Sequence, residues 1–319
     1  MGTLSARSTL DPTVEYKTNY CVPYWFRDQQ IKWAIEHVTG RIGPPGEKRS
    51  DPIAVVGFGP SLQQTWEQVK KFQSVITCSG AHRFLIDRGV IPTWHVEVDP
   101  RPHKVQILGL PHPDVTYLPA SACHPDYFRH LQKHDAKLLL WHVFANEEDA
   151  LRTLPRDEWA ITGGPDVGQR AMALARFLGF TNLHVFGVDG CAGSQKESHA
   201  TAHPNAPGAY GPCPYKGTTY YTTQALLECA KAMRHEVDML KDTTVTFYGE
   251  GLVQAMMQGY APNRPKDSVL AISKPALISP EMRDLNAQLH RDTPYYGTMA
   301  ERHVKMVLDV AKSMGTKNI

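Results

Sequence analysis

Residues 53–62 read IAVVGFGPSL, an apolar run that ends in a turn containing Gly57, Gly59, Pro60 and Ser61. A continuously apolar run is typical of a strand buried on both faces of a parallel sheet. The glycines let the backbone approach a ligand closely, and the free N–H groups at the start of the next helix favour an anion such as phosphate. We therefore expect this strand–turn–helix unit to bind a nucleotide. The alternative is a tight structural turn, since the stretch is neither a P-loop nor GxGxxG.

The alternation of apolar runs and helical stretches continues along the chain. Further runs of strand length are residues 74–80, 94–99, 115–120, 137–143, 159–164, 182–190 and 243–249. Helical periodicity lies between several of them, as in 61–72 and 165–180. Strand, helix, strand at this spacing predicts a Rossmann-like α/β fold, with a doubly wound and mostly parallel sheet.

The α/β pattern occupies the middle of the chain. Residues 1–50 are an aromatic-rich extension with a short helix expected around 28–38, residues 51–259 are the predicted α/β domain, and residues 260–319 are a linker and a helical tail. The amphipathic part of this C-terminal tail, roughly 299–314, cannot bury a core by itself. We expect it to dock on the domain or to pair with a second copy in a homo-oligomer.

Composition narrows the class of protein. The hydrophobic fraction of 42% and the charged fraction of 21% are ordinary for a globular chain, which argues against a disordered or fibrous protein. The net charge of +2 lacks the strongly basic footprint of a nucleic-acid-binding protein. No apolar run approaches the roughly 20 residues of a membrane helix. The first residues also lack a secretory signal, and the cysteines form no CxxC. We expect a cytoplasmic enzyme with no membrane partner.

A second motif, 95-HVEVDPRPHK-104, follows another buried strand. Asp99 at a strand end is suited to hold Mg²⁺ or a ribose or substrate hydroxyl, and Arg101 is suited to clamp a phosphate. Glu97 alternates with Asp99, so both side chains point to the same face. The alternative is an aspartate that caps a turn before Pro100.

A third motif repeats the glycine-then-helix design. Gly163 and Gly164 precede a helix whose first residue is expected to be Pro165, with Asp166 in its first turn. We expect the two glycines to form the other lip of a nucleotide crevice. A purely structural turn is the alternative.

The fourth motif is the long loop 190–219, which follows Asp189 at a strand end and contains His199 and His203. Histidine is the natural general base for deprotonating a hydroxyl acceptor, so we predict these three side chains to be catalytic. The alternatives are a zinc site or solvated loop histidines. Tyrosines in 218-TTYYTTQ-224 could contact a base or phosphate, or pack in the core.

Together these motifs resemble the 6-hydroxymethylpterin diphosphokinase MptE-like family, and particularly its phage-encoded members. The resemblance covers roughly residues 50–250 and rests on VVGFGPSL, VDPRP, PASACHPDYF with LWHV, GGPDVGQRAMALARFLGF and GVDGC followed by the histidine loop. The family is related in fold to sialyltransferase-like glycosyltransferases and to the central domain of flagellin-modifying Maf proteins, which implies a sialyltransferase-like variant of the GT-A fold. It also implies that the Gly57–Ser61 turn binds the donor nucleotide near Asp99. Asp189 and His199 would then line the reacting centre.

The tail carries a separate resemblance. Residues 278–297 are similar to the lead-in to phage S-adenosylmethionine-dependent methyltransferases. The chain ends before any glycine-rich cofactor loop of such a domain, so no methyl transfer is predicted.

The resulting prediction is a nucleotide-dependent transferase. The preferred reaction is glycosyl transfer from a CMP- or UDP-type nucleotide-sugar to a hydroxyl acceptor, with His199 or His203 as the base. One alternative is a diphosphokinase that uses ATP on a 6-hydroxymethylpterin-like alcohol, with Mg²⁺ held by Asp99 or Asp189. Another is a non-catalytic nucleotide-binding phage module. The acceptor stays open between a sugar, a pterin and a modified DNA base.

Overall fold

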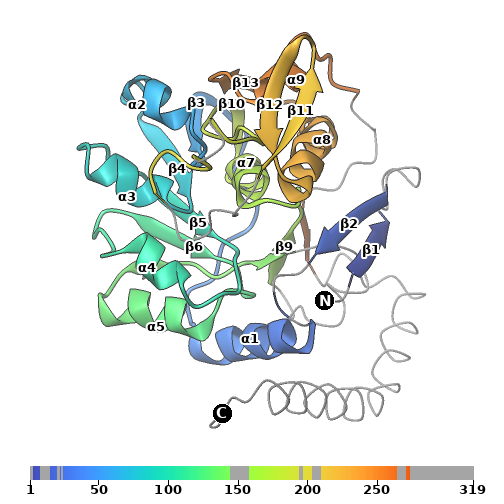
Figure 1. The fold of residues 1–319 in the computed structure, drawn as a ribbon. Helices are drawn as coiled ribbons and strands as arrows, with labels where there is room; N and C mark the ends of the chain where they lie inside the picture. Colours follow the sequence, from blue (N-terminus) through green and yellow to red (C-terminus); the bar gives the residue numbers. More distant parts are fainter. Residues whose placement is uncertain are drawn as a thin grey trace.

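A computed structural model of the protein describes residues 3–7, 15–19, 22, 24–143, 158–193, 197–202, 210–263 and 271–273. A seven-stranded sheet lies at its centre, and every neighbouring pair of its strands is parallel (Figure 1). In spatial order the strands are β13 (Thr244–Tyr248), β10 (Phe180–Phe186), β3 (Arg49–Val56), β4 (Ser74–Cys78), β5 (Trp94–Glu97), β6 (Thr116–Pro119) and β7 (Lys137–Leu138). The predicted α/β fold with a parallel sheet is confirmed.

Helices cover both faces of this sheet. Within β3, Ile53 and Val55 pack in the cluster that contains residues of α7 (Val167–Phe177) and α8 (Gln224–Met239). The alternate residues Ala54 and Val56 pack in a second cluster with residues of α2 (Leu62–Val69) and α3 (Ala81–Ile86). Burial on both faces explains why this strand is apolar at every position from Ile53 onward.

The remaining elements surround the sheet. The other helices are α1 (Tyr24–His37), α4 (Lys104–Leu108), α5 (Pro125–Lys133) and α9 (Leu252–Met257). A three-stranded sheet contains β14 (Ala271–Ser273), β9 (Trp159–Ile161) and β8 (His142–Val143). Two antiparallel pairs are β1 (Thr3–Arg7) with β2 (Glu15–Asn19), and β11 (Gly211–Tyr215) with β12 (Thr218–Thr222). Among these described helices, none is long and apolar enough to cross a membrane.

Two predicted strands and one predicted loop differ from the structure. The run 137–143 contributes to two sheets. Leu138 pairs with β6 and contacts on that side continue through Trp141, while Leu140 exchanges backbone hydrogen bonds with Gly40 and Ile42 on the opposite edge. The end of the run, β8, pairs with β9 in the separate sheet. The loop predicted over 190–219 also contains β11 and the start of β12. The tail segment 299–314 lies outside the described residues.

The strand order reverses direction next to β3. From β3 the chain builds outward through β4, β5, β6 and β7, and it then returns to place β10 on the opposite side of β3. In open parallel sheets, ligands bind outside the carboxyl ends of the strands at such a reversal point. The ends of β3 and β10 are therefore the first place to look for a site.

Candidate functional site

The carboxyl ends of β10, β3, β4 and β5 lie at one edge of the sheet, since these strands are neighbours and parallel. Predicted site residues in the segments that follow these ends are Gly57, Gly59, Pro60, Ser61, Asp99, Arg101 and Asp189. The His199 loop reaches the same edge, because the Ala200 amide donates a 3.0 Å hydrogen bond to the Phe58 carbonyl. His203 lies outside the described residues.

Asp189 joins the turn after β10 to the turn after β3. One carboxylate oxygen, Oδ2, accepts a 2.8 Å hydrogen bond from the Ser61 amide, and Oδ1 accepts one of 2.6 Å from the Ser61 hydroxyl. The side-chain amide of Gln254 also donates to Oδ1 at 3.1 Å. Burial raises the pKa of Asp189, although these hydrogen bonds oppose the rise. A carboxylate therefore occupies the start of α2, where the sequence predicts a phosphate.

The glycines of this turn allow the chain after β3 to lie close to the chain at the end of β10. The Gly57 amide donates to Phe186 at 2.8 Å and the Gly59 amide donates to Gly187 at 2.7 Å. A Cβ atom on Gly59 would clash with the Asp189 carboxylate. With the Ser61 amide, three backbone donors of the predicted phosphate turn are bonded within the protein in this structure.

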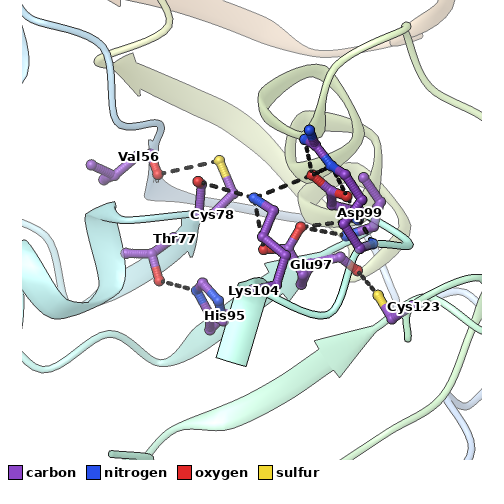
Figure 2. Close-up of polar contacts among 11 residues, drawn as sticks. Val56, Thr77, Cys78, His95, Glu97, Asp99, Lys104 and Cys123 are labelled. Atoms are coloured by element: carbon purple, nitrogen blue, oxygen red, sulfur yellow. Dashed lines mark hydrogen bonds and ion pairs between the residues drawn. The ribbon is translucent and has the colours of Figure 1, made fainter. Parts of the chain in front are cut away.

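A buried lysine lies at the end of β5 (Figure 2). Lys104 Nζ is 3.3 Å from Glu97 Oε2 and 3.6 Å from Asp99 Oδ2, and it donates a 3.4 Å hydrogen bond to Ser79 Oγ. Only 5% of its side chain is exposed. Burial lowers the pKa of Lys104, but the two carboxylates outweigh it and raise the pKa above its usual value. The group is an ammonium ion at neutral pH.

Asp99 is held by cations on both of its oxygens. Arg101 forms a two-point contact, with Nε 2.9 Å from Oδ1 and Nη2 2.5 Å from Oδ2. Burial raises the pKa of Asp99, but Arg101 and Lys104 together lower it below its usual value. A magnesium ion would have to displace both cations, so Asp99 does not fit a metal ligand in this arrangement. No cluster of three potential metal ligands occurs among the described residues.

Sequence reasoning missed Lys104 and Ser79. Lys104 closes the motif 95–104, so the signal was present, but only the turn into α4 brings its ammonium back over the end of β5. Ser79 follows β4 with a left-handed backbone, φ 52°. Nothing in the sequence singles out that serine.

His199 lies close enough to this centre for the Lys104 charge to affect its imidazole. Its ring centroid is 5.7 Å from that of Phe58, and Nδ1 is 2.6 Å from Ser198 Oγ. Burial, with added repulsion from the Lys104 ammonium, lowers the pKa of His199 to about 4. The imidazole is therefore neutral at pH 7.

The glycine pair before α7 reaches the same edge. A Cβ atom on Gly168 would lie 3.0 Å from Val188, which places the start of α7 beside the turn after β10. Asp166 is the N-cap of α7, not a first-turn residue, because its carboxylate accepts from the Gln169 amide at 2.9 Å in a capping box. The Gly164 amide hydrogen-bonds to buried Glu236, whose pKa burial raises to about 8.

A cleft of about 800 Å³ opens beside the Ser61–Asp189 pair. It is bounded by α2, by β12 and by residues 249–251. The predicted residues Pro60, Ser61 and Asp189 line it, whereas His199 does not.

The family model described as 6-hydroxymethylpterin diphosphokinase MptE-like matches residues 32–195, just over half of the chain. The chain belongs to this MptE-like family. The match includes the turn after β3, the Lys104 centre and the turn after β10. It ends before His199. No curated protein sequence matches this MptE-like chain.

One solved structure shows a similar fold. A Maf glycosyltransferase from Magnetospirillum magneticum AMB-1 superposes with a TM-score of 0.55 and 16% identity, over 86% of this chain and 42% of the Maf chain. The MptE-like chain therefore spans less than half of that protein. A mammalian sialyltransferase, with and without Gal-beta-1-3GalNAc-ortho-nitrophenol, gives TM-scores of 0.36 and 0.38 at 11% identity, over 72% of this chain and 88% and 87% of the other.

Proposed function

We propose that this MptE-like protein is a nucleotide-dependent glycosyltransferase whose donor phosphate binds beside Lys104. The observation that carries the proposal is the buried ammonium of Lys104 at the end of β5, close enough to His199 to lower the pKa of that imidazole. One group is suited to a leaving phosphate and the other to an acceptor proton. Both lie at the sheet edge where ligands of such folds bind.

The transfer follows from these two groups. An acceptor hydroxyl attacks the anomeric carbon of the donor sugar and passes its proton to His199. The new C–O bond forms as the bond between that carbon and the phosphate oxygen breaks, and the nucleotide leaves with the electron pair. Lys104 stabilises the negative charge that grows on the phosphate oxygen. A bound phosphate also offsets the repulsion from Lys104. The pKa of His199 then rises, and the imidazole becomes a stronger base.

Family and fold support a transferase. The description of the family names a diphosphokinase, and the Maf neighbour is a glycosyltransferase. Both reactions join a hydroxyl to an electrophile carried by a nucleotide, so one crevice is suited to either.

Diphosphokinase activity is the second candidate, and the family description favours it. That reaction needs Mg²⁺ on the transferred phosphates. Asp99 is held by Arg101 and Lys104, and Asp189 is bonded to Ser61. This arrangement favours glycosyl transfer, in which a fixed cation stabilises the leaving phosphate.

Calorimetric titration with CMP, UDP and ATP, each with and without Mg²⁺, tests the proposal. We expect CMP or UDP to bind without metal. Binding of ATP alone, and only with Mg²⁺, would support the diphosphokinase instead. The absence of binding by all three nucleotides would contradict both enzymatic functions.

The role of His199 is tested by turnover of the matching nucleotide-sugar. His199→Ala should lower kcat by about 100-fold or more if the imidazole takes the acceptor proton. His134→Ala, at an exposed position after α5, is the control and should retain wild-type turnover. Unchanged turnover in His199→Ala would remove this residue from the mechanism.

A further inference from the structure

The cleft beside Ser61 and Asp189 has a chemistry different from that of the Lys104 centre. Its volume of about 800 Å³ is within the range of small-molecule sites. Carboxylates of Asp189, Glu197 and Glu250 line it, and no lysine or arginine is among its described lining residues. Among the residues that the structure describes around this cleft, a phosphate would meet carboxylates and no lysine or arginine. The cleft is therefore poorly suited to the nucleotide donor.

The same lining suits a ligand rich in hydroxyl groups. Side-chain amides from one face of α2, at Gln63, Gln64 and Gln68, line the cleft. An amide both donates and accepts hydrogen bonds, as a sugar hydroxyl does, and a carboxylate accepts from a hydroxyl. Tyr220 and Tyr221 of β12 also line the cleft and offer aromatic surface to the C–H groups of a sugar ring.

The cleft is also connected to the proposed base. The side-chain amide of Gln63 donates a hydrogen bond to the carbonyl of Ala200, the residue after His199. Glu197, two residues before His199, lines the cleft. The loop that carries His199 thus lines the cleft at Glu197 and is hydrogen-bonded at Ala200 to a residue that lines it. His199 itself does not line the cleft.

We infer that this cleft binds the acceptor, and that the acceptor is an uncharged saccharide. The inference rests on the proposed glycosyl transfer. The donor phosphate binds at the Lys104 centre, the acceptor binds between α2 and β12, and the loop that carries His199 contacts the residues of this cleft. The carboxylates Glu197 and Glu250 exclude acceptors that carry a phosphate or a carboxylate.

Equilibrium binding to the full chain tests the inference with matched pairs of sugars. The probes are neutral mono- and disaccharides and the same sugars carrying a phosphate, with 6-hydroxymethylpterin as a separate probe. We expect at least one neutral sugar to bind about 10-fold more tightly than its phosphorylated counterpart. Preference for the phosphorylated sugar, preference for the pterin, or binding of no sugar would overturn the inference.

A charge-reversal pair locates the binding site. Glu250→Lys places a cation on the cleft, so the preference for the neutral sugar should fall by about 10-fold. Glu67→Lys makes the same charge change at an exposed position of α2 that does not line the cleft, and it should leave the preference within about 2-fold of wild type. An equal effect of both variants, or no effect of Glu250→Lys, would show that the sugar binds elsewhere.

A titration with both ligands separates this inference from the proposed function. Sugar binding should persist when the nucleotide site is saturated, because the two sites are distinct. Competition between nucleotide and sugar would overturn the separate acceptor cleft while leaving nucleotide use intact. Sugar binding without any nucleotide binding would leave the cleft assignment standing and remove the glycosyltransferase.

Discussion

Charged side chains at the carboxyl edge are bound to partners, and those partners determine what each charge is able to do. Lys104 is enclosed by Glu97 and Asp99, which keep it protonated despite its burial. Asp189 accepts hydrogen bonds from the amide and the hydroxyl of Ser61, so these two donors do not form an open phosphate site. The predicted residues Ser61, Asp99 and Asp189 thus lie at the expected edge and also take part in the contacts that hold it together.

Sequence patterns predict these residues one by one and not their pairings. A strand that ends in VDG indicates that Asp189 lies at the sheet edge. Its contact with Ser61 spans 128 positions in the chain and depends on β10 lying next to β3. Lys104 was not predicted for the same reason, because its role follows from the contacts of α4.

Glu236 provides a pH-dependent test at the residue scale. Burial raises its pKa from 4.5 to about 8, so the folded protein holds the proton that the unfolded chain releases. The stability contributed by this group is complete below pH 4.5 and is lost as the pH rises towards 8. Glu236→Gln does not titrate, so its stability relative to wild type should rise by about 1.4 kcal/mol per pH unit across this window. Urea unfolding at several pH values measures the difference.

Glu228→Gln is the matched control for this experiment. Glu228 lies on the same helix α8, with about half of its side chain exposed. Glu228→Gln makes the same chemical change at this more exposed position and provides the reference profile. A profile for Glu236→Gln that does not differ from the reference would show that the Glu236 carboxyl is not held protonated.

At the scale of elements, the start of α7 depends on its N-cap residue, Asp166. Asp166 accepts the Gln169 amide hydrogen bond and begins the helix beside the turn after β10. Asp166→Ala removes this cap and should lower the free energy of unfolding by about 0.5–2 kcal/mol. Asp166→Asn keeps an acceptor oxygen and should cost less. Equal losses in the two variants, measured by urea unfolding, would show that the cap bond is not the source of the stability.

Strands are predictable here where one apolar run pairs along its whole length. The runs at 53–59 and 74–80 contain central strands because both faces and both edges of these strands are covered. The run 137–143 is equally apolar, but its start pairs with β6 in the central sheet and its end pairs with β9 in a separate sheet. Periodicity reports burial and does not report which strand is the neighbour, so this division could not be predicted.

At the scale of the whole molecule, the reversal of strand order beside β3 brings the motifs to one edge. The parallel sheet was predictable from strand–helix alternation, and the convergence of the motifs follows from it. The division of that edge into a cationic centre and a cation-poor cleft was not predictable. It arises from α2, β12 and the His199 loop, which are joined only in the folded chain.

The most direct test of the central claim is a crystal structure with the nucleotide that calorimetry selects. The account predicts a phosphate oxygen within hydrogen-bond distance of Lys104 Nζ or Ser79 Oγ, with the cleft between α2 and β12 left for a second molecule. A nucleotide bound inside that cleft, or on a face remote from Lys104, would contradict the account.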